Sequence, residues 1–339
     1  MPSFLVTGGC GFIGQTLVGQ LLRDGANFVR IVDDLSAGRP ENLPQTAEIE
    51  YAEPSDFGLP VKPVQLLVGD IRDAALAEAA CRGVDVIIHL AANTGVAPSV
   101  ADPRTDCTAN VIGTLNYLEG ARHAGVKRFV FASSGATIGD CVPPIHEQLP
   151  ARPVSPYGAS KLAGEAYCSA YAHSFGIATV ALRFGNVYGP GSEHKESVVA
   201  KFIRRALAGQ PLQIYGDGAQ TRDFVFVDDL VRAITRAAEA QNVGGEVFQI
   251  ATARETTVGE LAELLADAIV AEGYPRPRIE HVDRRVGDVL RNFADTSKAQ
   301  ARLEWAARTS LHEGLRSTVR WALGNNTLTG AVPRTEGPG

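Results

Sequence analysis

The chain has 339 residues, of which 45% are hydrophobic and 21% are charged, the balance of an ordinary globular protein with one large domain or two joined lobes. This composition excludes collagen, coiled coils and intrinsically disordered chains. The 32 Lys and Arg residues against 38 Asp and Glu give a net charge of −6, and no basic run occurs, so nucleic acid and anionic membranes are poor candidate partners.

Apolar, β-rich segments alternate with helical patterns through the first half of the chain. This order of strands and helices is typical of βαβ crossovers, and it predicts a doubly wound parallel sheet with helices on both faces, the Rossmann fold. The strands that we expect are 3–7, 27–33, 64–68, 84–90, 128–132 and 179–184. The expected helices are 15–23, 101–124 and 156–174.

Two regions depart from this alternation. The segment 41–63 is rich in Glu and Pro, and we expect an irregular excursion there, with room for a short strand at Ile49–Tyr51. After Gly185 the elements become shorter and are joined by loops with Gly and Pro, which favours a smaller, interleaved α/β lobe. The boundaries that we predict are 1–184 for the large domain with 222–250 returning to it, 185–221 and 251–323 for the smaller lobe, and 324–339 for a flexible tail.

The cysteines point to a reducing compartment. The five cysteines are scattered, and no CxxC motif or Cys/His cluster occurs. This pattern disfavours a disulfide framework and a metal site. The N-terminus lacks the basic and apolar regions of a signal peptide, and no apolar run approaches the roughly 20 residues that span a bilayer. We therefore expect a cytoplasmic protein without a metal or a membrane contact.

A glycine-rich motif joins the first strand to the first helix. In this position Gly8 permits a tight turn, Gly11 lets the backbone approach a pyrophosphate, and Gly14 allows close packing of helix and strand. Asp33 stands 19 residues after Gly14, at the end of the second strand, where a carboxylate binds ribose hydroxyls and repels a 2′-phosphate. The motif predicts NAD rather than NADP; the alternative is a glycine turn without a ligand.

Tyr157 and Lys161 are four residues apart in a helical pattern, so they share one helix face. A free tyrosine has a pKa near 10, and a neighbouring ammonium lowers it toward the range of a useful base. Without the dinucleotide motif, an exposed helical pair would be the simpler interpretation.

Two serines, Ser133 and Ser134, end the fifth strand. Ligands of doubly wound sheets bind at the carboxyl ends of the strands, so either hydroxyl is placed to contact a substrate, although a strand-end cap remains an alternative for Ser133.

Together these motifs resemble the extended short-chain dehydrogenase/reductases, and among them the nucleotide-sugar epimerases similar to UDP-glucose (UDP-galactose) 4-epimerase. The resemblance extends from the glycine motif to the region around Arg285. The other matching segments are Gly69-Asp70-Ile71, His89-Leu90-Ala91-Ala92, Asn110-Val111-Ile112-Gly113-Thr114, Arg183 to Pro190, Arg222-Asp223-Phe224 and Arg285-Val286-Gly287-Asp288.

The resemblance implies a role for each matching residue. The implied catalytic residues are Ser134, which stands five residues before Gly139, together with Tyr157 and Lys161. The implied NAD contacts are Gly8, Gly11, Phe12, Ile13, Gly14, Asp33, Asp34, Asp70, Ile71, Leu90, Ala91, Ala92, Asn110, Tyr157, Lys161 and Phe184. The implied contacts of the UDP-sugar substrate are Thr94, Ser134, Asn186, Gln213, Tyr215, Arg222, Arg285, Asp288 and Asn292.

Three positions depart from the family pattern. Ile138 stands where many relatives have Tyr, and Thr94 stands where a lysine reaches the cofactor in some epimerases. Asn292 stands where some epimerases carry a bulky Tyr over the sugar, which implies room for UDP-N-acetylhexosamine or UDP-glucuronate as well as UDP-glucose and UDP-galactose.

The residues after Ser134 distinguish between the reactions of this family. Dehydratases that resemble this chain carry an Asp-Glu pair there, whereas this chain has Gly135 and Ala136, which cannot transfer protons. We therefore expect C4 epimerisation of a UDP-sugar through a 4-keto intermediate. The alternatives are an NAD-dependent nucleotide-sugar dehydratase or reductase and a non-catalytic dinucleotide-binding protein.

The family also implies a homodimer that forms through two helices of each subunit. Here these are the helix near 105–123 and the helix of Tyr157, which carries a stripe of small and apolar residues. The alternative is that this stripe packs only on its own sheet. The residues of the stripe are Ala159, Leu162, Ala163, Ala166, Ala170 and Tyr171.

Overall fold

A computed structural model describes residues 2–44, 47–53, 62–284 and 289–324. Its centre is an eight-stranded sheet in which all neighbouring strands are parallel. In spatial order the strands are β12 (Glu246–Ile250), β7 (Ala178–Phe184), β6 (Arg128–Ser134), β5 (Val86–His89), β1 (Phe4–Thr7), β2 (Val29–Asp33), β4 (Val64–Val68) and β3 (Ile49–Tyr51). The predicted fold class is confirmed.

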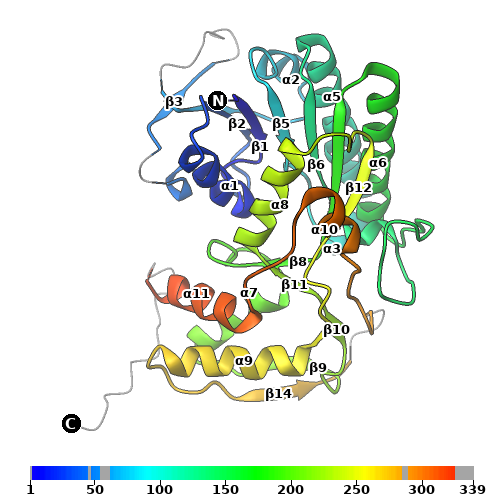
Figure 1. Cartoon of the computed structure of the whole chain (residues 1–339). Coiled ribbons are helices and arrows are strands. Elements are labelled where there is room, and N and C mark those ends of the chain that lie inside the picture. Colours follow the sequence, from blue (N-terminus) through cyan, green and yellow to red (C-terminus); the bar gives the residue numbers. More distant parts are fainter. Residues whose placement is uncertain (1, 45–46, 54–61, 285–288, 325–339) are drawn as a thin grey trace.

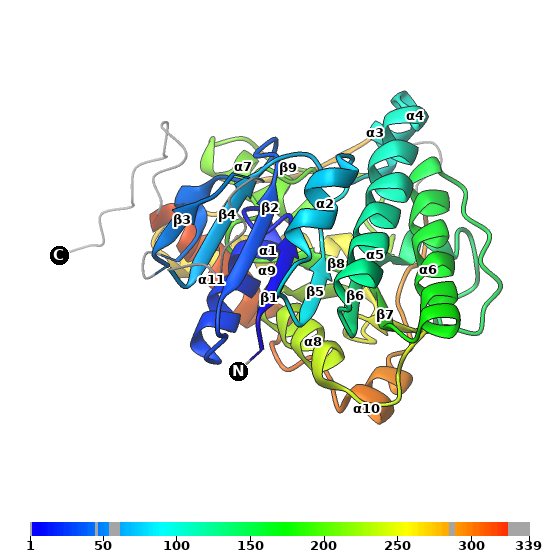
Figure 2. The same cartoon turned by 90° about the horizontal axis from the view of Figure 1, so that it is seen from above.

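Helices cover both faces of this sheet (Figures 1 and 2). One face carries α1 (Phe12–Arg23), α8 (Val227–Glu239) and α10 (Ser297–Leu303). The other carries α2 (Ala74–Ala80), α5 (Gly113–Ala124) and α6 (Pro156–Phe175). Successive residues of a strand point to opposite faces, so in β1 Leu5 joins one hydrophobic cluster and Val6 the other. Both faces are therefore apolar, which is why these strands are continuous hydrophobic runs.

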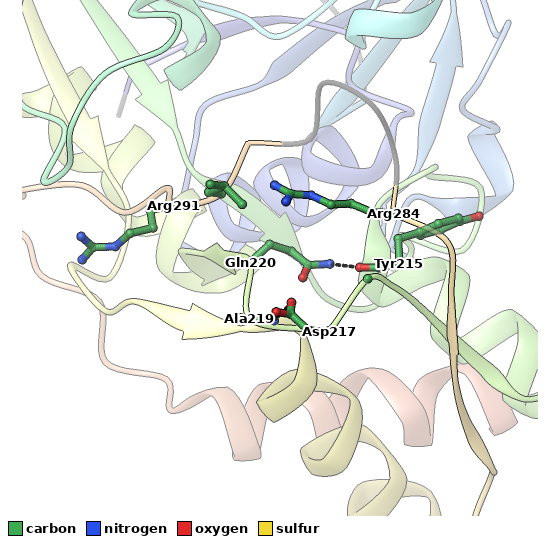
Figure 3. Close-up of a pocket in the computed structure, with 8 residues that line it drawn as sticks. Tyr215, Asp217, Ala219, Gln220, Arg284 and Arg291 are labelled. Atoms are coloured by element: carbon green, nitrogen blue, oxygen red, sulfur yellow. Dashed lines mark hydrogen bonds between the residues drawn. The ribbon is translucent and has the colours of Figure 1, made fainter.

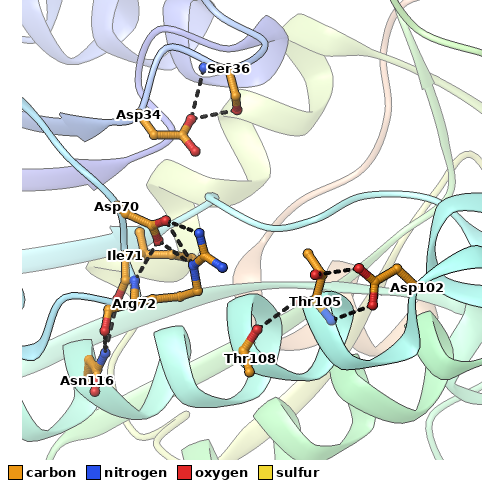
Figure 4. A network of polar contacts seen from close by, with 9 residues as sticks. All are labelled: Asp34, Ser36, Asp70, Ile71, Arg72, Asp102, Thr105, Thr108 and Asn116. Atoms are coloured by element: carbon orange, nitrogen blue, oxygen red, sulfur yellow. Dashed lines mark hydrogen bonds and ion pairs between the residues drawn. The ribbon is translucent and has the colours of Figure 1, made fainter.

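The predicted helix 101–124 is wrong as a single element. The structure divides this region into α3 (Val96–Ala101), α4 (Pro103–Cys107), a π-helical turn (Thr108–Ile112) and α5. Pro103 disfavours helical backbone at Asp102, which has φ −139° and ψ 82°. The Asp102 side chain then caps α4 by accepting a hydrogen bond from the Thr105 N–H at 3.0 Å (Figure 4).

Shorter elements form the lower part of the molecule in Figure 1. The helices there are α7 (Val198–Leu207), α9 (Val258–Ala271) and α11 (Leu311–Gly324). Three two-stranded pairs accompany them: β8 (Asn186–Tyr188) with β11 (Phe224–Phe226), β9 (Leu212–Tyr215) with β14 (Ile279–Val282), and β10 (Thr221–Arg222) with β13 (Thr256–Thr257).

The chain passes between the two parts more than once, because β12 lies in the large sheet next to β7. We propose that residues 1–184 and 222–250 form the large domain, and that residues 185–221 and 251–323 form the smaller lobe. Gly324, which we assigned to the tail, is the last residue of α11, and the rest of that predicted tail lies outside the described residues. No helix among the described residues is long and apolar enough to cross a membrane.

A buried ion pair fixes α6 against the sheet. Glu165 of α6 and Arg183 of β7 form two hydrogen bonds at 2.8 and 2.7 Å, and each side chain is only 5% exposed. The Ser133 hydroxyl of β6 donates to the same carboxylate at 2.5 Å. Because Glu165 lies one turn beyond Lys161, this cluster also determines the position of the helix that carries the candidate catalytic pair.

This ion pair yields a test of stability. Glu165→Gln leaves the Arg183 guanidinium buried without its counter-ion, and we expect the free energy of unfolding to fall by about 3–5 kcal/mol. Glu263→Gln, which breaks the exposed pair with Arg276, should cost about 1 kcal/mol or less. Urea denaturation of both variants measures the difference, and equal losses would contradict a structural role for the buried pair.

Candidate active site

The turn between β1 and α1 has the backbone that a bound diphosphate requires. Gly8 has a φ of +71°, and a Cβ on Gly14 would lie 2.2 Å from the Gly8 carbonyl oxygen. A Cβ on Gly11 would meet only that oxygen, at 3.3 Å, so this side of the turn is open. No side chain caps α1 and its first turn holds no acid, which leaves the N–H groups of Phe12 and Ile13 for an anion. These residues fit the pyrophosphate of a dinucleotide.

Asp33 and Asp34 lie beside this turn, at the end of β2. The Asp33 carboxylate accepts hydrogen bonds from the N–H groups of Cys10 and Leu35, both at 2.9 Å. Burial raises the pKa of Asp33, and the two backbone hydrogen bonds oppose this shift. The carboxylate is therefore held at the carboxyl end of β2, beside the glycine turn, where an acid binds ribose hydroxyls in such folds. Asp34 instead accepts from the N–H and the hydroxyl of Ser36 (Figure 4).

Asp70 and Ile71 follow β4, the neighbour of β2. Arg72 donates to the Asp70 carboxylate at 2.8 and 2.5 Å and holds the pKa of that carboxyl below its usual range (Figure 4). Arg72 also interacts electrostatically with Asp34, which places the predicted adenosine contacts in one region. The Asn116 amide of α5 donates to the Ile71 carbonyl at 3.1 Å and fixes this loop on the helix.

His89 ends β5 and connects three elements. Its Nδ1 lies 2.9 Å from the Thr7 hydroxyl of β1, and its Nε2 lies 3.2 Å from the Thr114 hydroxyl of α5. Burial, and then the positive charge of Lys161, lower the pKa of His89 to about 3. The imidazole is therefore neutral at physiological pH, and each ring nitrogen has a hydroxyl partner.

The predicted cofactor residues Leu90, Ala91 and Ala92 continue from β5 as the second wall of the glycine turn. The Ala91 N–H donates to the Thr7 hydroxyl at 3.2 Å. A Cβ on Gly8 would lie only 2.9 Å from the Ala91 nitrogen, so a larger residue at either position would separate the two walls.

Asn110 is the centre of a buried polar network in the π-helical turn. Its side chain bonds both the N–H and the carbonyl of Asn93, at 2.8 and 2.9 Å. Its amide also lies within hydrogen-bond distance of the Asp106 carboxylate at 2.9 Å and the Ser160 hydroxyl at 3.1 Å. The network links the loop after β5 to α6, and we propose that Asn110 acts on the cofactor site by holding these elements.

Tyr157 lies in the first turn of α6, which Ser155 caps by accepting from the Gly158 N–H at 3.1 Å. Burial raises the pKa of the Tyr157 phenol, and the Asp106 charge adds to this rise. A hydrogen bond with the Ser134 side chain acts in the opposite direction. The structure thus brings the predicted Ser134 and Tyr157 together at the end of β6.

Lys161 lies one turn further along α6 and is 3% exposed. Its Nζ is 5.0 Å from the centroid of the Phe131 ring and 6.0 Å from that of Tyr157. Burial lowers the pKa of Lys161 to about 8, and the Asp106 charge opposes this shift. At neutral pH the group is therefore an ammonium held beside the phenol, as a base-activating residue requires.

The two strand-end serines have different partners. Ser133 is 3% exposed and donates to Glu165, so its hydroxyl belongs to the buried ion pair. Ser134 interacts with Tyr157, and it also accepts from the Ala136 N–H at 3.2 Å. The geometry favours Ser134 as the residue that faces a substrate, and it explains Ser133 as a structural group.

A short path of strand pairs leads from the catalytic residues to the predicted substrate residues. Ser134 is the register partner of Phe184 at the ends of β6 and β7. Two residues later Asn186 pairs with Phe224 in β8 and β11, and its amide donates to the Asp223 carbonyl at 3.4 Å. Arg222 precedes this point and donates to the Val289 carbonyl at 2.7 Å.

A cavity of about 200 Å³ opens beside these strands (Figure 3). The predicted substrate residue Tyr215 lines it, and the Gln220 amide donates to the Tyr215 carbonyl at 2.9 Å. Gln213 lies on the same strand, opposite Glu280 of β14. The other lining residues are Gly216, Asp217, Ala219, Arg284, Leu290 and Arg291.

The remaining predicted residues lie in several places. Thr94 is exposed just before α3, and Ile138 is 1% exposed in a small apolar cluster with Ile145. Both side chains are uncharged, so neither replaces the lysine or the tyrosine of related enzymes. The Asn292 N–H lies 3.3 Å from the Thr221 hydroxyl, beside β10. Arg285 and Asp288 lie outside the described residues. Groups of three or more His, Cys, Asp or Glu that could hold a metal are absent from the described ranges.

Sequence reasoning did not identify Asp106 or Arg284. Asp106 is 1% exposed, and one of its carboxylate oxygens has no hydrogen-bond partner. In the sequence it is one of several polar residues in its segment, and nothing marks it out. Arg284 is adjacent to Arg285, which we selected in its place as a candidate. A single buried acid such as Asp106 leaves no periodic signal in the sequence, so only the fold reveals it.

Comparison with known proteins gives a consistent result. The model of the NAD dependent epimerase/dehydratase family matches residues 4–251. A UDP-glucose 4-epimerase of Mycolicibacterium smegmatis is 41% identical over 322 residues, which are 94% of this chain and 97% of that protein.

Solved structures are similar over the same length. The UDP-glucose 4-epimerase of Thermotoga maritima, solved with UDP-glucose, has a TM-score of 0.83 at 36% identity and covers 95% of this chain and 99% of its own. The UDP-N-acetylglucosamine 4-epimerase of Methanobrevibacter ruminantium, in complex with UDP-N-acetylmuramic acid, has a TM-score of 0.84 at 31% identity and covers 96% and 99%.

The position of Asp33 predicts the choice of dinucleotide. A 2′-phosphate beside this carboxylate suffers like-charge repulsion, so NAD should raise the melting temperature and NADP should not. Asp33→Asn removes the charge and should bring the two effects closer together. A thermal-shift titration measures this, and equal stabilisation of the unchanged protein by both dinucleotides would exclude Asp33 as the discriminating group.

Proposed function

The chain belongs to the NAD dependent epimerase/dehydratase family, and we propose on this basis that it inverts C4 of a UDP-sugar through a 4-keto intermediate, as an isomerase. One observation carries the choice of reaction: Ser134 and Tyr157 interact at the end of β6, and the two residues that follow Ser134 are Gly135 and Ala136. A base is available for one hydroxyl, but these two positions offer no acid to eliminate water. Epimerisation needs no more than this.

Tyr157 is the proposed general base. Its phenol oxygen would take the proton of the sugar 4-hydroxyl and return it after the sugar has turned. The Ser134 hydroxyl lies next to the Tyr157 phenol and would orient the sugar 4-hydroxyl by a hydrogen bond. Partial burial matters here, because a phenolate formed away from water retains its basicity for the substrate.

Lys161 is proposed to favour the charged form of Tyr157. Its ammonium is buried beside the phenol, so the field between the two groups is only weakly screened. The same ammonium is placed to hold a ribose hydroxyl of the cofactor. Lys161 is thus a positioning and electrostatic group, not a proton carrier.

When bound at the glycine turn, NAD would supply a reversible hydride acceptor for the sugar and would not be consumed overall. The residues proposed to hold it are the open turn of Gly8 to Gly14, the Asp33 carboxylate and the wall of Leu90 to Ala92. A reductase would instead consume NADH, and a dinucleotide-binding protein without activity would have no need of the buried Tyr157 and Lys161 pair.

The nucleotide part of the substrate is proposed to bind on the smaller lobe. Tyr215 and Arg284 line the cavity there, and Arg222 lies on the neighbouring strand. A guanidinium matches the oxygens of a diphosphate, and an aromatic ring provides a face for a base. If UDP is anchored on the smaller lobe, the sugar would remain free to turn between oxidation and reduction at C4.

The catalytic proposal predicts the effect of Tyr157→Phe. The substitution removes the group that moves the 4-hydroxyl proton, so turnover of UDP-glucose should fall by about two to four orders of magnitude, whereas bound NAD should remain. Product analysis and NAD content of the purified variant give both values. A variant with nearly normal turnover would refute this role of Tyr157.

The identity of the sugar is proposed from Asn292, which is smaller than the Tyr of some related epimerases. Asn292 lies beside β10, where its N–H is 3.3 Å from the Thr221 hydroxyl, and a side chain smaller than Tyr is proposed to admit an N-acetyl or carboxylate group that its amide is able to bond. The M. ruminantium enzyme of this fold takes a sugar with an N-acetyl group. We propose that UDP-N-acetylhexosamines or UDP-glucuronate are accepted together with UDP-glucose.

This proposal predicts a change of preference in Asn292→Tyr. The larger ring should reduce kcat/KM for the enlarged sugars by more than for UDP-glucose, because it occupies the space of the substituent. Rates on UDP-glucose, UDP-galactose, a UDP-N-acetylhexosamine and UDP-glucuronate test this for both proteins. If the unchanged enzyme rejects every enlarged sugar, or if the preference does not move, Asn292 does not control access.

A homodimer in the cytoplasm is the proposed form of the enzyme. In α6, Ala159, Ala166, Tyr167 and Ala170 are exposed, whereas Tyr171 is buried against Glu119 of α5. Three of the six residues of the small-residue stripe are therefore exposed and do not pack on the sheet of their own subunit, and their helix lies next to α5 (Figure 2). This arrangement supports close helix packing with a second subunit.

The assembly has its own test. We expect light scattering at micromolar concentration to give twice the chain mass, and Ala166→Arg, which adds a long charged side chain to the exposed stripe, to give the chain mass. A single-chain mass for the unchanged protein would rule out the dimer.

A further inference from the structure

A segment of the smaller lobe lies directly on the first turn of α1. A Cβ on Gly191 would be 1.9 Å from the Gln15 amide nitrogen and 3.6 Å from the Phe12 ring. Four residues later the Lys195 Nζ lies 5.2 Å from the centroid of that ring. Lys195 therefore stands over the residue that opens α1, although it is far from the glycine motif in the sequence.

The backbone around Lys195 is well fixed. The Ser192 hydroxyl donates to the Gly189 carbonyl at 2.6 Å, and the Lys195 N–H donates to the Ser192 carbonyl at 3.0 Å. Arg204 of α7 donates to the Lys195 carbonyl at 2.7 Å. The backbone that carries the Lys195 side chain is thus held by the fold of the smaller lobe.

The Lys195 ammonium has no carboxylate partner among the described residues. Neither neighbouring acid pairs with it: Glu196 pairs with Lys201 and Arg204, and Glu193 has one carboxylate oxygen 3.2 Å from His194 Nε2 and the other buried without a hydrogen-bond partner. Burial lowers the pKa of Lys195, and no acid acts against that shift. A desolvated cation without a counter-ion is costly, and the positive end of α1 adds to the cost. An anion is therefore expected at this point.

The surroundings determine the chemical class of this anion. The first N–H groups of α1 have no side-chain cap and no acid in their turn, and the Lys195 ammonium lies over the ring of Phe12, the first residue of that helix. Backbone N–H groups at a helix start, together with an ammonium on a flexible stem, are the donors that bind phosphates.

We propose that Lys195 binds the diphosphate of a nucleotide ligand at the start of α1, from the side of the smaller lobe. The proposal rests on the proposed function, in which both ligands, NAD and the UDP-sugar, contain a diphosphate. A ligand held in this way joins the segment of Gly189 to Lys195 to α1, so its binding would draw the two parts of the molecule together.

The test compares two lysines of the same region. Lys195→Met removes the proposed contact, whereas Lys201→Met removes an ammonium that already pairs with Glu196 and serves as the control. For each full-length variant, the NAD retained during dialysis and the dissociation constants of NAD and of UDP are measured, the latter with NAD saturating. Neither measurement depends on turnover, so a failure of the proposed function would be seen separately, as binding without product.

We expect Lys195→Met to weaken one ligand by about 10- to 100-fold, Lys201→Met to have little effect, and Lys195→Arg to restore most of the affinity. Weaker NAD assigns the contact to the cofactor, and weaker UDP with unchanged NAD assigns it to the substrate. The difference should shrink at high salt. Unchanged binding of both ligands in Lys195→Met would overturn the proposal.

The ligand-free stability distinguishes this proposal from a structural role. Removing an unpaired, desolvated ammonium should leave the melting temperature of the ligand-free variant equal or higher. A clear fall in that temperature, with a loss of affinity no larger than the loss of stability explains, would show that Lys195 stabilises the fold and would also overturn the proposal.

Discussion

The site depends on one constraint: an ammonium must stay buried beside a phenol while helix α6 holds both at the end of β6. Burial lowers the pKa of Lys161, and with the surrounding charges included that pKa is about 8, so the group stays an ammonium at neutral pH by a small margin. The Asp106 charge from α4 opposes that shift, and the Phe131 ring offers its face to the cation at 5.0 Å. The surrounding fold must therefore bring an acid, a ring and a helix to the same point.

Close packing of α6 on the sheet satisfies this constraint. A Cβ on Gly164 would lie 2.3 Å from the Phe131 ring, and one on Gly158 would lie 2.4 Å from the Ala136 carbonyl oxygen. Only glycine permits the helix to approach β6 this closely. The ion pair of Glu165 with Arg183 then fixes the helix one turn beyond Lys161. Residues that pack or fix the helix and the candidate catalytic residues thus lie along the same helix.

The sheet was predictable because its strands are apolar on both faces and follow one another with helical crossovers. The glycine turn was predictable because three glycines and Asp33 mark it together. The break at Pro103 was visible in the sequence, but the long apolar periodicity after it concealed the change from α4 to α5. The burial of Asp106 and the missing counter-ion of Lys195 were not predictable, because both are properties of the fold. The roles of the candidate site residues remain predictions.

The reaction itself is tested most directly by the hydrogen at C4. The purified protein with its bound NAD is incubated with UDP-glucose in D₂O, and the C4 position of the UDP-galactose formed is examined by NMR. Transfer of a hydride from C4 and its return to the other face predict that the original hydrogen is retained, without net formation of NADH. Deuterium at C4 of the product would contradict this mechanism.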